Sequence, residues 1–311
     1  MTQRLPILLS FHALAGNSAT LISGQLTYTT ISDFSFRDYS RRKTLRTLVR
    51  LYRTKPYADQ YIVLIFDKAE VRAKTDAYGS FYMATPVMLK QSVLRKVVLA
   101  SGAEVKMVED LYPLEVQEVA KDVIVVSDID DTLMHSFIYR KLRKFRTLMF
   151  TAVEKRKAVL HMQEVLYGFT RSGAASIYLS NSEQNLYPLI YRFLMYNNFP
   201  PGPLFLKKMR RLWDVLWNVK FPLRNVHKQQ TLKDVIVLFP DKKFVLMGDN
   251  TQQDLIIYLE AAEQFPQNIT DIIIRKVIDK KEDRVLLKKY EQMLKANNIN
   301  LYYSDSFPTS P

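Results

Sequence analysis

Two aspartates two positions apart, directly after an apolar run, are the residues of this sequence best placed to do chemistry. The run Val123-Ile124-Val125-Val126 leads through Ser127 into Asp128-Ile129-Asp130-Asp131-Thr132. A continuous Val/Ile run is typical of a buried parallel strand, and open α/β sheets bind ligands at the carboxyl ends of their strands. At such a place one carboxylate can attack an electrophile while the other handles the leaving group's proton. An acidic turn with Thr132 as a helix cap is the alternative that these residues alone leave open.

Hydroxyl, amide and amino groups follow at two later points. Ser180 comes after the apolar residues Ile177-Tyr178-Leu179 and opens the segment Ser180-Asn181-Ser182-Glu183. Such groups at a strand end and helix start can hold a phosphate oxygen, although they can equally form an N-cap pair. Lys228 begins a predicted helix, where a cation is mildly unfavourable against the helix dipole. It therefore faces either an anion or solvent.

A second acidic pair follows another apolar run. Residues 244–247 lead into Gly248-Asp249, and Asp254 comes five residues after Asp249. Together with Asp128 these two carboxylates would form an all-oxygen site suited to Mg²⁺, which binds through a few carboxylates plus water and phosphate. The acid pair, the serine, the lysine and the Gly-Asp pair each stand at a predicted strand end or helix start, and this order predicts a shared site.

In this order the residues resemble the four motifs of haloacid-dehalogenase-superfamily phosphatases. Within that superfamily the chain is similar to the actin-patch-type phosphatidate phosphatases over roughly residues 121–280. The segments that carry the similarity are residues 178–182, 185–188, 199–204, 227–228, 239–240 and 248–254. Glu183 departs from the family pattern, which has proline after the serine. The segment Ser23-Gly24-Gln25-Leu26 fits the β-rich domain that precedes the family's catalytic domain only loosely.

The resemblance implies a Mg²⁺-dependent phosphomonoester hydrolase that works through an aspartyl phosphate, with phosphatidate or a related lipid phosphate as substrate. Asp128 would be the nucleophile, Asp130 the general acid and base, and Lys228 the cation that offsets the charge of the phosphate. The expected substrate-binding residues are Thr132, Ser180, Asn181 and Lys228. The expected metal ligands are Asp128, Asp130, Asp249 and Asp254, with Asp130 contributing its backbone carbonyl. Asp131 is expected to shape the loop.

The 311 residues suit about two domains. Residues 1–120 read mainly as short strands with turn signals, which predicts a β-rich, sandwich-like domain, interrupted by a basic amphipathic helix within residues 37–55. From residue 121 strand-like and helical stretches alternate, which predicts an α/β domain with a Rossmann-like parallel sheet, HAD-like by resemblance, over residues 121–311. The expected strands cover residues 123–126, 176–179, 244–247 and 272–274, and the expected helices residues 139–169, 183–196, 228–239, 252–264 and 282–296.

The composition of the chain indicates which class of partner it binds and which compartment it occupies. A net charge of +14 favours anionic partners, and the absence of cysteine is compatible with a reducing compartment. No stretch approaches the ~18 to 20 apolar residues of a membrane span, and residues 6–11 are better explained as a first strand than as a signal peptide. We therefore expect a cytoplasmic protein.

The substrate is less well defined by the sequence. Basic residues in the segment 140–157, and at 207, 208, 210 and 211 beside Trp213 and Trp217, suit peripheral contact with an acidic membrane surface. A solvated basic face is equally compatible. No nucleic-acid-binding module accompanies these residues, so no nucleic-acid partner is expected. Two other functions remain open: a phosphatase of a nucleic-acid terminal phosphate or a soluble phosphoester, and a non-enzymatic lipid-binding adaptor.

Overall fold

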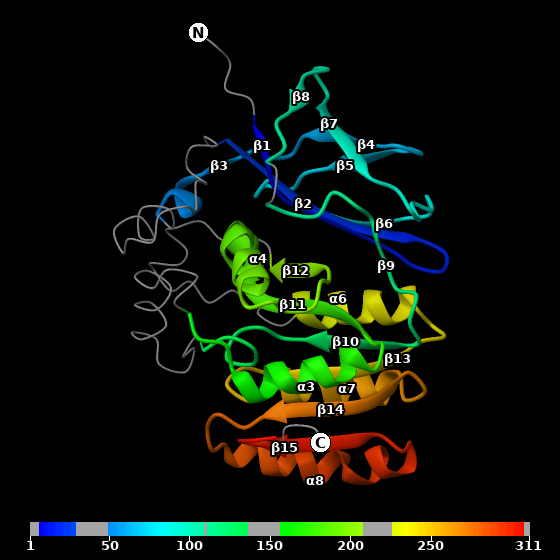
Figure 1. The fold of residues 1–311 in the computed structure, drawn as a ribbon, viewed down its shortest axis with the longest axis vertical. Coiled ribbons are helices and arrows are strands. Elements are labelled where there is room, and N and C mark those ends of the chain that lie inside the picture. Colours follow the sequence, from blue (N-terminus) through cyan, green and yellow to red (C-terminus); the bar gives the residue numbers. More distant parts are fainter. Residues whose placement is uncertain (1–5, 29–48, 109–110, 136–155, 208–225, 308–311) are drawn as a thin grey trace.

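The computed structural model describes residues 6–28, 49–108, 111–135, 156–207 and 226–307 (Figure 1). The described residues within 7–118, here called the β region, form two sheets. Residues 123–304, here called the α/β region, form a third sheet with its helices. Among the described residues, no helix combines the length and the hydrophobicity needed to cross a membrane.

The β region consists of a five-stranded and a four-stranded sheet that share a buried core. The first contains β1 (Ile7–Ala15), β2 (Thr20–Tyr28), β3 (Lys55–Pro56), β6 (Ser80–Thr85) and β9 (Gln117–Glu118). The second contains β4 (Tyr61–Phe66), β5 (Glu70–Lys74), β7 (Leu94–Leu99) and β8 (Glu104–Val105). The rings of Phe11 and Phe66, one from each sheet, lie 6.3 Å apart. Residues 49–53 are helical, whereas residues 37–48 of the predicted basic helix lie outside the described residues.

The α/β region is built on a six-stranded parallel sheet. Its strands are β10 (Val123–Ser127), β11 (Ala175–Glu183), β12 (Leu204–Lys207), β13 (Lys243–Asp249), β14 (Ile269–Arg275) and β15 (Asn300–Ser304). The spatial order is β12-β11-β10-β13-β14-β15. If β10 is taken as the first strand, the order is third, second, first, fourth, fifth, sixth, as in doubly wound sheets that bind ligands where the order reverses. Here that point lies between β10 and β13.

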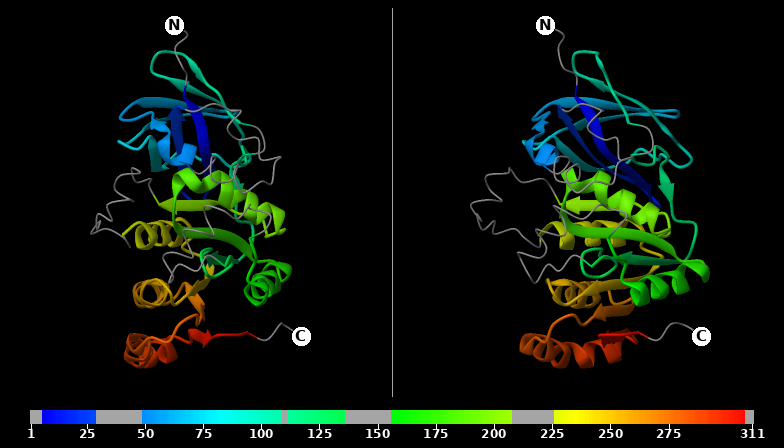
Figure 2. Two further views of the ribbon diagram at one scale, coloured as in Figure 1. Left: turned by 90° about the vertical axis from the view of Figure 1, so that its left-hand side faces the viewer. Right: turned by 60° about the vertical axis from the view of Figure 1, so that its left-hand side comes forward.

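Helices cover both faces of this sheet because its strands are apolar on both sides. α3 (Leu160–Arg171) and α4 (Tyr187–Tyr196) pack in the same core cluster as Val125 and Val245. α6 (Val226–Leu238), α7 (Asp254–Gln264) and α8 (Lys281–Ala296) pack in the cluster of Ile124 and Leu246, on the opposite face. Figure 2 shows α3 on one side of the sheet and α6, α7 and α8 on the other. The predicted parallel sheet with helices on both faces is thus present.

In two places, described residues just before a helix are not helical although the sequence predicts that they are. Residues 139–155 lie outside the described residues, and residues 156–159 are not helical, because Ala158 forms an isolated antiparallel bridge with Met134. α3 therefore starts at Leu160. Glu183 ends β11 in an extended conformation, and the short 3₁₀-helix Gln184–Leu186 precedes α4. Both starts are set by strand-like pairing that the helical periodicity does not reveal.

The β region packs against the helices of the α/β region. The Tyr82 hydroxyl donates to Asp234 of α6 at 2.7 Å, and the Tyr187 hydroxyl of α4 donates to the Phe11 carbonyl at 3.3 Å. His12 of β1 is buried against the rings of Tyr187 and Phe205. The five-stranded sheet therefore contacts α6, the helix that carries Lys228.

Candidate active site

The polar residues singled out in the sequence meet at the carboxyl ends of β10, β11 and β13. These strand ends lie at the left of the sheet in Figure 1. Ser127 is in register with Tyr178 of β11 and with Met247 of β13. Because all three strands run parallel, Asp128, Ser180 and Asp249 lie together at the carboxyl ends of the strands. Lys228 reaches these strand ends from the first turn of α6.

Lys228 connects two of the three carboxylates at the site, those of Asp128 and Asp254. Its Nζ donates to Asp128 Oδ1 at 2.8 Å and to Asp254 Oδ1 at 2.5 Å, and all three side chains are fully buried. The ring of Tyr258 lies beneath the ammonium group, 5.8 Å from its centroid to Nζ. Lys228 therefore faces anions rather than solvent, which decides between the two alternatives that its helix position left open.

The carboxylates of Asp128, Asp249 and Asp254 gather around one small volume. Each offers an oxygen within 4.8 Å of the other two, and all three residues are buried. Thr132 Oγ1 lies 3.1 Å from Asp128 Oδ2 and 3.3 Å from Asp249 Oδ2, so one hydroxyl hydrogen serves two acceptors. The side chain of Thr132 thus joins the acid cluster.

Three buried carboxylates against one ammonium group leave an excess of negative charge, and the pKa values reflect this. Burial raises the pKa of Asp128 well above its usual range, and Lys228 only partly opposes the effect. Burial, reinforced by Asp254, raises the pKa of Asp249 to about 7. Burial lowers the pKa of Lys228, but Asp128 and Asp254 outweigh it and hold that pKa well above its usual range. The cluster is therefore stabilised by protons or by an added cation.

The donor set fits a hard divalent cation. All three acidic residues present oxygen atoms, which Mg²⁺ prefers, and the described residues place no sulfur or imidazole ligand in the cluster. Two positive charges would balance the difference between three carboxylates and one ammonium. A buried acidic cluster of this kind can therefore hold a metal ion.

Asp130 lies beside the acid cluster and is held by two serines of β11. Its Oδ2 accepts hydrogen bonds from Ser180 Oγ at 3.1 Å and Ser182 Oγ at 2.5 Å. Its Oδ1 is buried and finds no hydrogen-bond partner in the described part of the chain. Ser180, expected to hold a phosphate oxygen, here donates to Asp130 and accepts from the Ser182 backbone N–H at 2.9 Å.

The remaining expected residues shape the surrounding loops. Asp131 adopts a positive φ of 59°, and Arg275 Nη1 donates to its carbonyl at 2.6 Å. The Asn181 side-chain amide donates to Gln252 Oε1 at 3.3 Å, which links the β11 loop to the loop after β13. Glu183 has a φ of −79°, a value that proline can also adopt. Glutamate in place of the family's proline therefore leaves this backbone conformation available.

The structure brings together all eight candidate residues, although Asn181 contacts the cluster only through the neighbouring loop. The sequence did not single out the roles of Ser182, Arg275, Tyr258 and Asn250. Ser182 could have been found from its spacing of two residues from Ser180.

Asn250 accepts hydrogen bonds at its Oδ1 from the backbone N–H groups of residues 277 and 278. Its side-chain amide donates to Asp283 and Tyr303. It thereby anchors the loop after Asp249 to α8 and β15.

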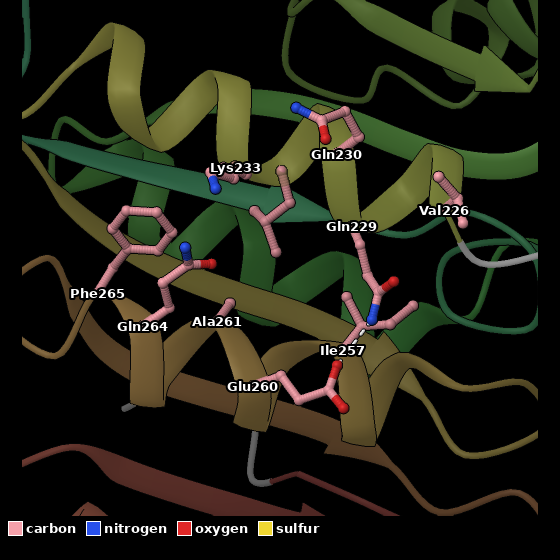
Figure 3. Close-up of a pocket in the computed structure, with 10 residues that line it drawn as sticks. Val226, Gln229, Gln230, Lys233, Ile257, Glu260, Ala261, Gln264 and Phe265 are labelled. Atoms are coloured by element: carbon pink, nitrogen blue, oxygen red, sulfur yellow. Dashed lines mark hydrogen bonds between the residues drawn. The ribbon is translucent and has the colours of Figure 1, made fainter.

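Two further features lie away from this site. A cleft of about 260 Å³ opens between α6 and α7, where the Gln229 amide donates to Glu260 at 2.7 Å (Figure 3). Lys228 is not among the residues of α6 that line this cleft, and its side chain reaches the acid cluster instead. Of the basic cluster predicted at residues 207–217, Lys207 ends β12 and the rest lies outside the described residues.

Residues 123–276 match the model of a family described as the catalytic domain of phosphatidate phosphatase APP1. This segment belongs to that family. The match begins at the first residue of β10 and ends just after Arg275, so it includes Asp128, Ser180, Lys228 and Asp249. The family that the sequence motifs resemble is thereby confirmed for this segment.

Two curated proteins are similar to the chain. It is 32% identical over 179 residues to phosphatidate phosphatase APP1 of Saccharomyces cerevisiae, an alignment that covers 56% of this chain and 29% of the yeast protein. It is 29% identical over 259 residues to an uncharacterized protein of Schizosaccharomyces pombe, covering 81% of this chain and 40% of that protein. The chain thus spans less than half the length of either relative.

A solved structure of a carbohydrate acetylesterase from Xanthomonas citri is also similar. It is 12% identical, with a TM-score of 0.33 over 97% of this chain and 68% of the other. This likeness is too weak to bear on the fold or the chemistry.

Proposed function

We propose that this protein is a Mg²⁺-dependent phosphomonoester hydrolase that forms an aspartyl phosphate on Asp128, with phosphatidate or a related lipid phosphate as substrate. The observation that carries the proposal is the contact of Lys228 with both Asp128 and Asp254 in a fully buried acid cluster. Membership of residues 123–276 in the APP1 catalytic-domain family supports the same chemistry. The doubly wound strand order supports a HAD-like assignment of this sheet.

The proposed reaction assigns one task to each acid of the first motif. A carboxylate oxygen of Asp128 attacks phosphorus, and Asp130 protonates the leaving alkoxide. Asp130 then takes a proton from the water that hydrolyses the aspartyl phosphate. Lys228 favours the ionised form of Asp128, against the effect of burial, and offsets the charge of the incoming phosphate. Ser180 binds a phosphoryl oxygen after it rotates away from Asp130, and Thr132 and Asn181 line the substrate position.

The proposed metal ligands are Asp128, Asp249 and Asp254, with the Asp130 backbone carbonyl as a further donor. When bound, Mg²⁺ supplies charge neutralisation for a phosphate that three carboxylates would otherwise repel. Thr132 and the backbone N–H of Thr251, which donates to Asp249 Oδ1 at 2.5 Å, orient the carboxylates toward this position.

An enzyme explains the acid cluster better than a lipid-binding adaptor does. A binding module gains nothing from three buried carboxylates, whose desolvation is unfavourable, whereas phosphoryl transfer uses all of them. The choice of lipid phosphate over a soluble phosphoester or a nucleic-acid end rests on the family and on the net charge of +14. Peripheral contact with an acidic membrane and a cytoplasmic location stay predictions.

We also propose the division of the chain that the sequence suggests. Residues 121–311 would form the catalytic domain, and residues 1–120 a smaller β-rich domain that packs against it. The contacts of Tyr82 with Asp234 and of Asn17 with Asp241 support a β-rich domain that steadies α6 and the loop after it.

The proposal is tested by phosphate release from vesicles that contain phosphatidate, with and without Mg²⁺. Release by the wild-type protein should require Mg²⁺, and Asp128→Asn should reduce it by several orders of magnitude while the thermal unfolding profile persists. A soluble sugar phosphate and a 5′-phosphorylated oligonucleotide serve as competing substrates. Wild-type-like release by a folded Asp128→Asn protein would refute the mechanism, and faster release from either competing substrate would refute the lipid assignment.

A further inference from the structure

Ser182 contacts Asp130 more closely than Ser180 does, although the proposed mechanism gives Ser182 no task. Ser182 Oγ lies 2.5 Å from Asp130 Oδ2, against 3.1 Å for Ser180 Oγ. Ser182 and Asp130 are both buried. Both hydroxyls therefore donate to the same carboxyl oxygen of Asp130.

An irregularity in β11 places Ser182 at this position. Ser180 is in register with Leu206 of β12, and the next registered pair is Glu183 with Lys207. Asn181 and Ser182 are therefore extra residues on β11, and bulges of this kind redirect side chains near active sites. The backbone N–H of Ser182 donates to Ser180 Oγ at 2.9 Å, which fixes the two hydroxyls side by side.

The two carboxyl oxygens of Asp130 differ in the hydrogen bonds that they accept from the two serines. Oδ2 accepts both hydroxyl hydrogen bonds, whereas Oδ1 is buried and has no hydrogen-bond partner among the residues that the structure describes. An oxygen that accepts two hydrogen bonds has both lone pairs engaged and is poorly placed to carry a proton. The proton exchanged with a leaving group therefore belongs on Oδ1.

We propose that Ser182 is a positioning residue, which holds Oδ2 of Asp130 so that Oδ1 faces the leaving group. This inference rests on the proposed phosphatase function. In the first step a bond forms between an Asp128 oxygen and phosphorus while the P–O bond to the leaving oxygen breaks; the leaving oxygen receives the proton from Oδ1, which leaves Asp130 as a carboxylate. In the second step water attacks phosphorus, the bond between phosphorus and the Asp128 oxygen breaks to release phosphate, and one proton of that water moves to Oδ1 of Asp130. When Ser180 rotates toward the phosphoryl group, Ser182 is the donor that keeps Oδ2 in place.

The experiment compares two leaving groups in three variants. An alkyl phosphate needs protonation of its leaving oxygen, whereas p-nitrophenyl phosphate, with a good leaving group, needs little. Ser182→Ala removes the hydroxyl, and Ser182→Thr keeps it. Ser10→Ala removes the hydroxyl of another buried serine, in β1, whose Oγ has no hydrogen-bond partner among the described residues. Steady-state kinetics give kcat and KM for each substrate, and calorimetry gives the Mg²⁺ affinity.

Ser182→Ala should lower kcat for the alkyl phosphate by about 10- to 100-fold and for p-nitrophenyl phosphate by less than about 3-fold. KM and the Mg²⁺ affinity should stay near wild type, and Ser182→Thr should recover most of the alkyl-phosphate rate. Equal losses on both substrates, or no recovery with threonine, would overturn the role of Ser182 while leaving the phosphatase function intact. A wild-type protein that is inactive on both substrates with Mg²⁺ would instead overturn the proposed function itself.

Discussion

Asp128, Asp249 and Asp254 compete for the single ammonium group of Lys228, which contacts Asp128 and Asp254. This arrangement makes the site unfavourable without a further cation, because buried like charges raise one another's free energy. The raised pKa values of Asp128 and Asp249 express the same imbalance. At the scale of single residues, the fold therefore holds three carboxylates together at a cost in stability, and this creates a position where a cation can bind.

The pKa of Asp249, raised to about 7 by burial and by Asp254, predicts a pH-dependent metal affinity. Below pH 7 a proton occupies Asp249 and must leave when Mg²⁺ binds, so the affinity should fall by up to about tenfold per pH unit. Above pH 7 it should level off. Calorimetry at pH 6 in two buffers of different ionisation enthalpy would measure the released proton. Binding without proton release at pH 6 would contradict the assignment of Asp249 as a ligand.

Lys228→Met should destabilise the metal-free protein, because it leaves Asp128 and Asp254 buried without their partner. Removing one member of a buried ion pair typically costs about 3–5 kcal/mol. Adding Asp254→Asn to Lys228→Met removes one of the abandoned charges and should recover part of the loss. Denaturant unfolding of both single variants and the double variant measures this coupling. Additive losses in the double variant would show that Lys228 and Asp254 do not depend on each other.

At the scale of elements, the end of β13 is shaped by the lack of a side chain at Gly248. A Cβ at this position would lie 2.7 Å from both the Cβ and Oδ2 of Asp254. Gly248→Ala should therefore displace Asp254 from Lys228 and weaken Mg²⁺ binding by at least about tenfold, in the range seen when groups that orient metal ligands are removed. Calorimetry with Mg²⁺ gives the affinity directly.

A matched control for this prediction is Gly102→Ala. Gly102 has a positive φ of 82°, and no described residue lies within 4 Å of an added Cβ, so alanine there strains only a turn of the β region. It should lower the thermal stability slightly and leave the Mg²⁺ affinity unchanged. Equal Mg²⁺ affinities in the two variants would show that close packing at Gly248 does not position Asp254.

Sequence patterns predicted the elements that position the site because buried parallel strands have a strong signature. The apolar runs before Asp128, Ser180 and Asp249 gave β10, β11 and β13, and parallel pairing then brings their ends together. β12 and β15 at the two edges of the sheet were not predicted, since short strands carry little periodicity.

The finer geometry of the site depends on features that spacing does not encode. The contact of Ser182 with Asp130 requires the two extra residues in β11. The hydrogen bond from Arg275 to the Asp131 carbonyl joins residues 144 positions apart. The helix predicted through residues 156–159 gives way to a bridge between Ala158 and Met134. Each depends on tertiary pairing, which overrides local propensity.

At the scale of the whole molecule, the β region and the α/β region meet around a buried histidine. His12 of β1 lies edge-on to Phe205 at 4.4 Å between ring centroids and parallel to Tyr187 at 6.3 Å. Within the described residues, neither of its ring nitrogens has a hydrogen-bond partner. Burial, with a smaller contribution from His227, lowers the pKa of His12 to about 3. The two regions are thus packed around an imidazole that must stay neutral.

Because His12 is buried in its neutral form, we expect the free energy of unfolding to fall when the pH is lowered. In the unfolded chain His12 takes up a proton below about pH 6.5, whereas in the folded protein it stays neutral down to about pH 3. The unfolded state therefore binds more protons between these values, and stability falls as the pH is lowered through that window. At pH 5 the contribution of His12 should be about 2 kcal/mol less favourable than at pH 7.5.

His12→Phe should remove this component, because phenylalanine keeps a ring between Phe205 and Tyr187 and does not titrate. The variant should be at least as stable as the wild type at pH 7.5, and the difference in its favour should grow at pH 5. Denaturant unfolding of both proteins at the two pH values measures it, and the carboxylates that both share cancel in the comparison. If the two proteins lose equal stability between pH 7.5 and pH 5, then His12 is protonated in the folded state or is not buried between the two regions.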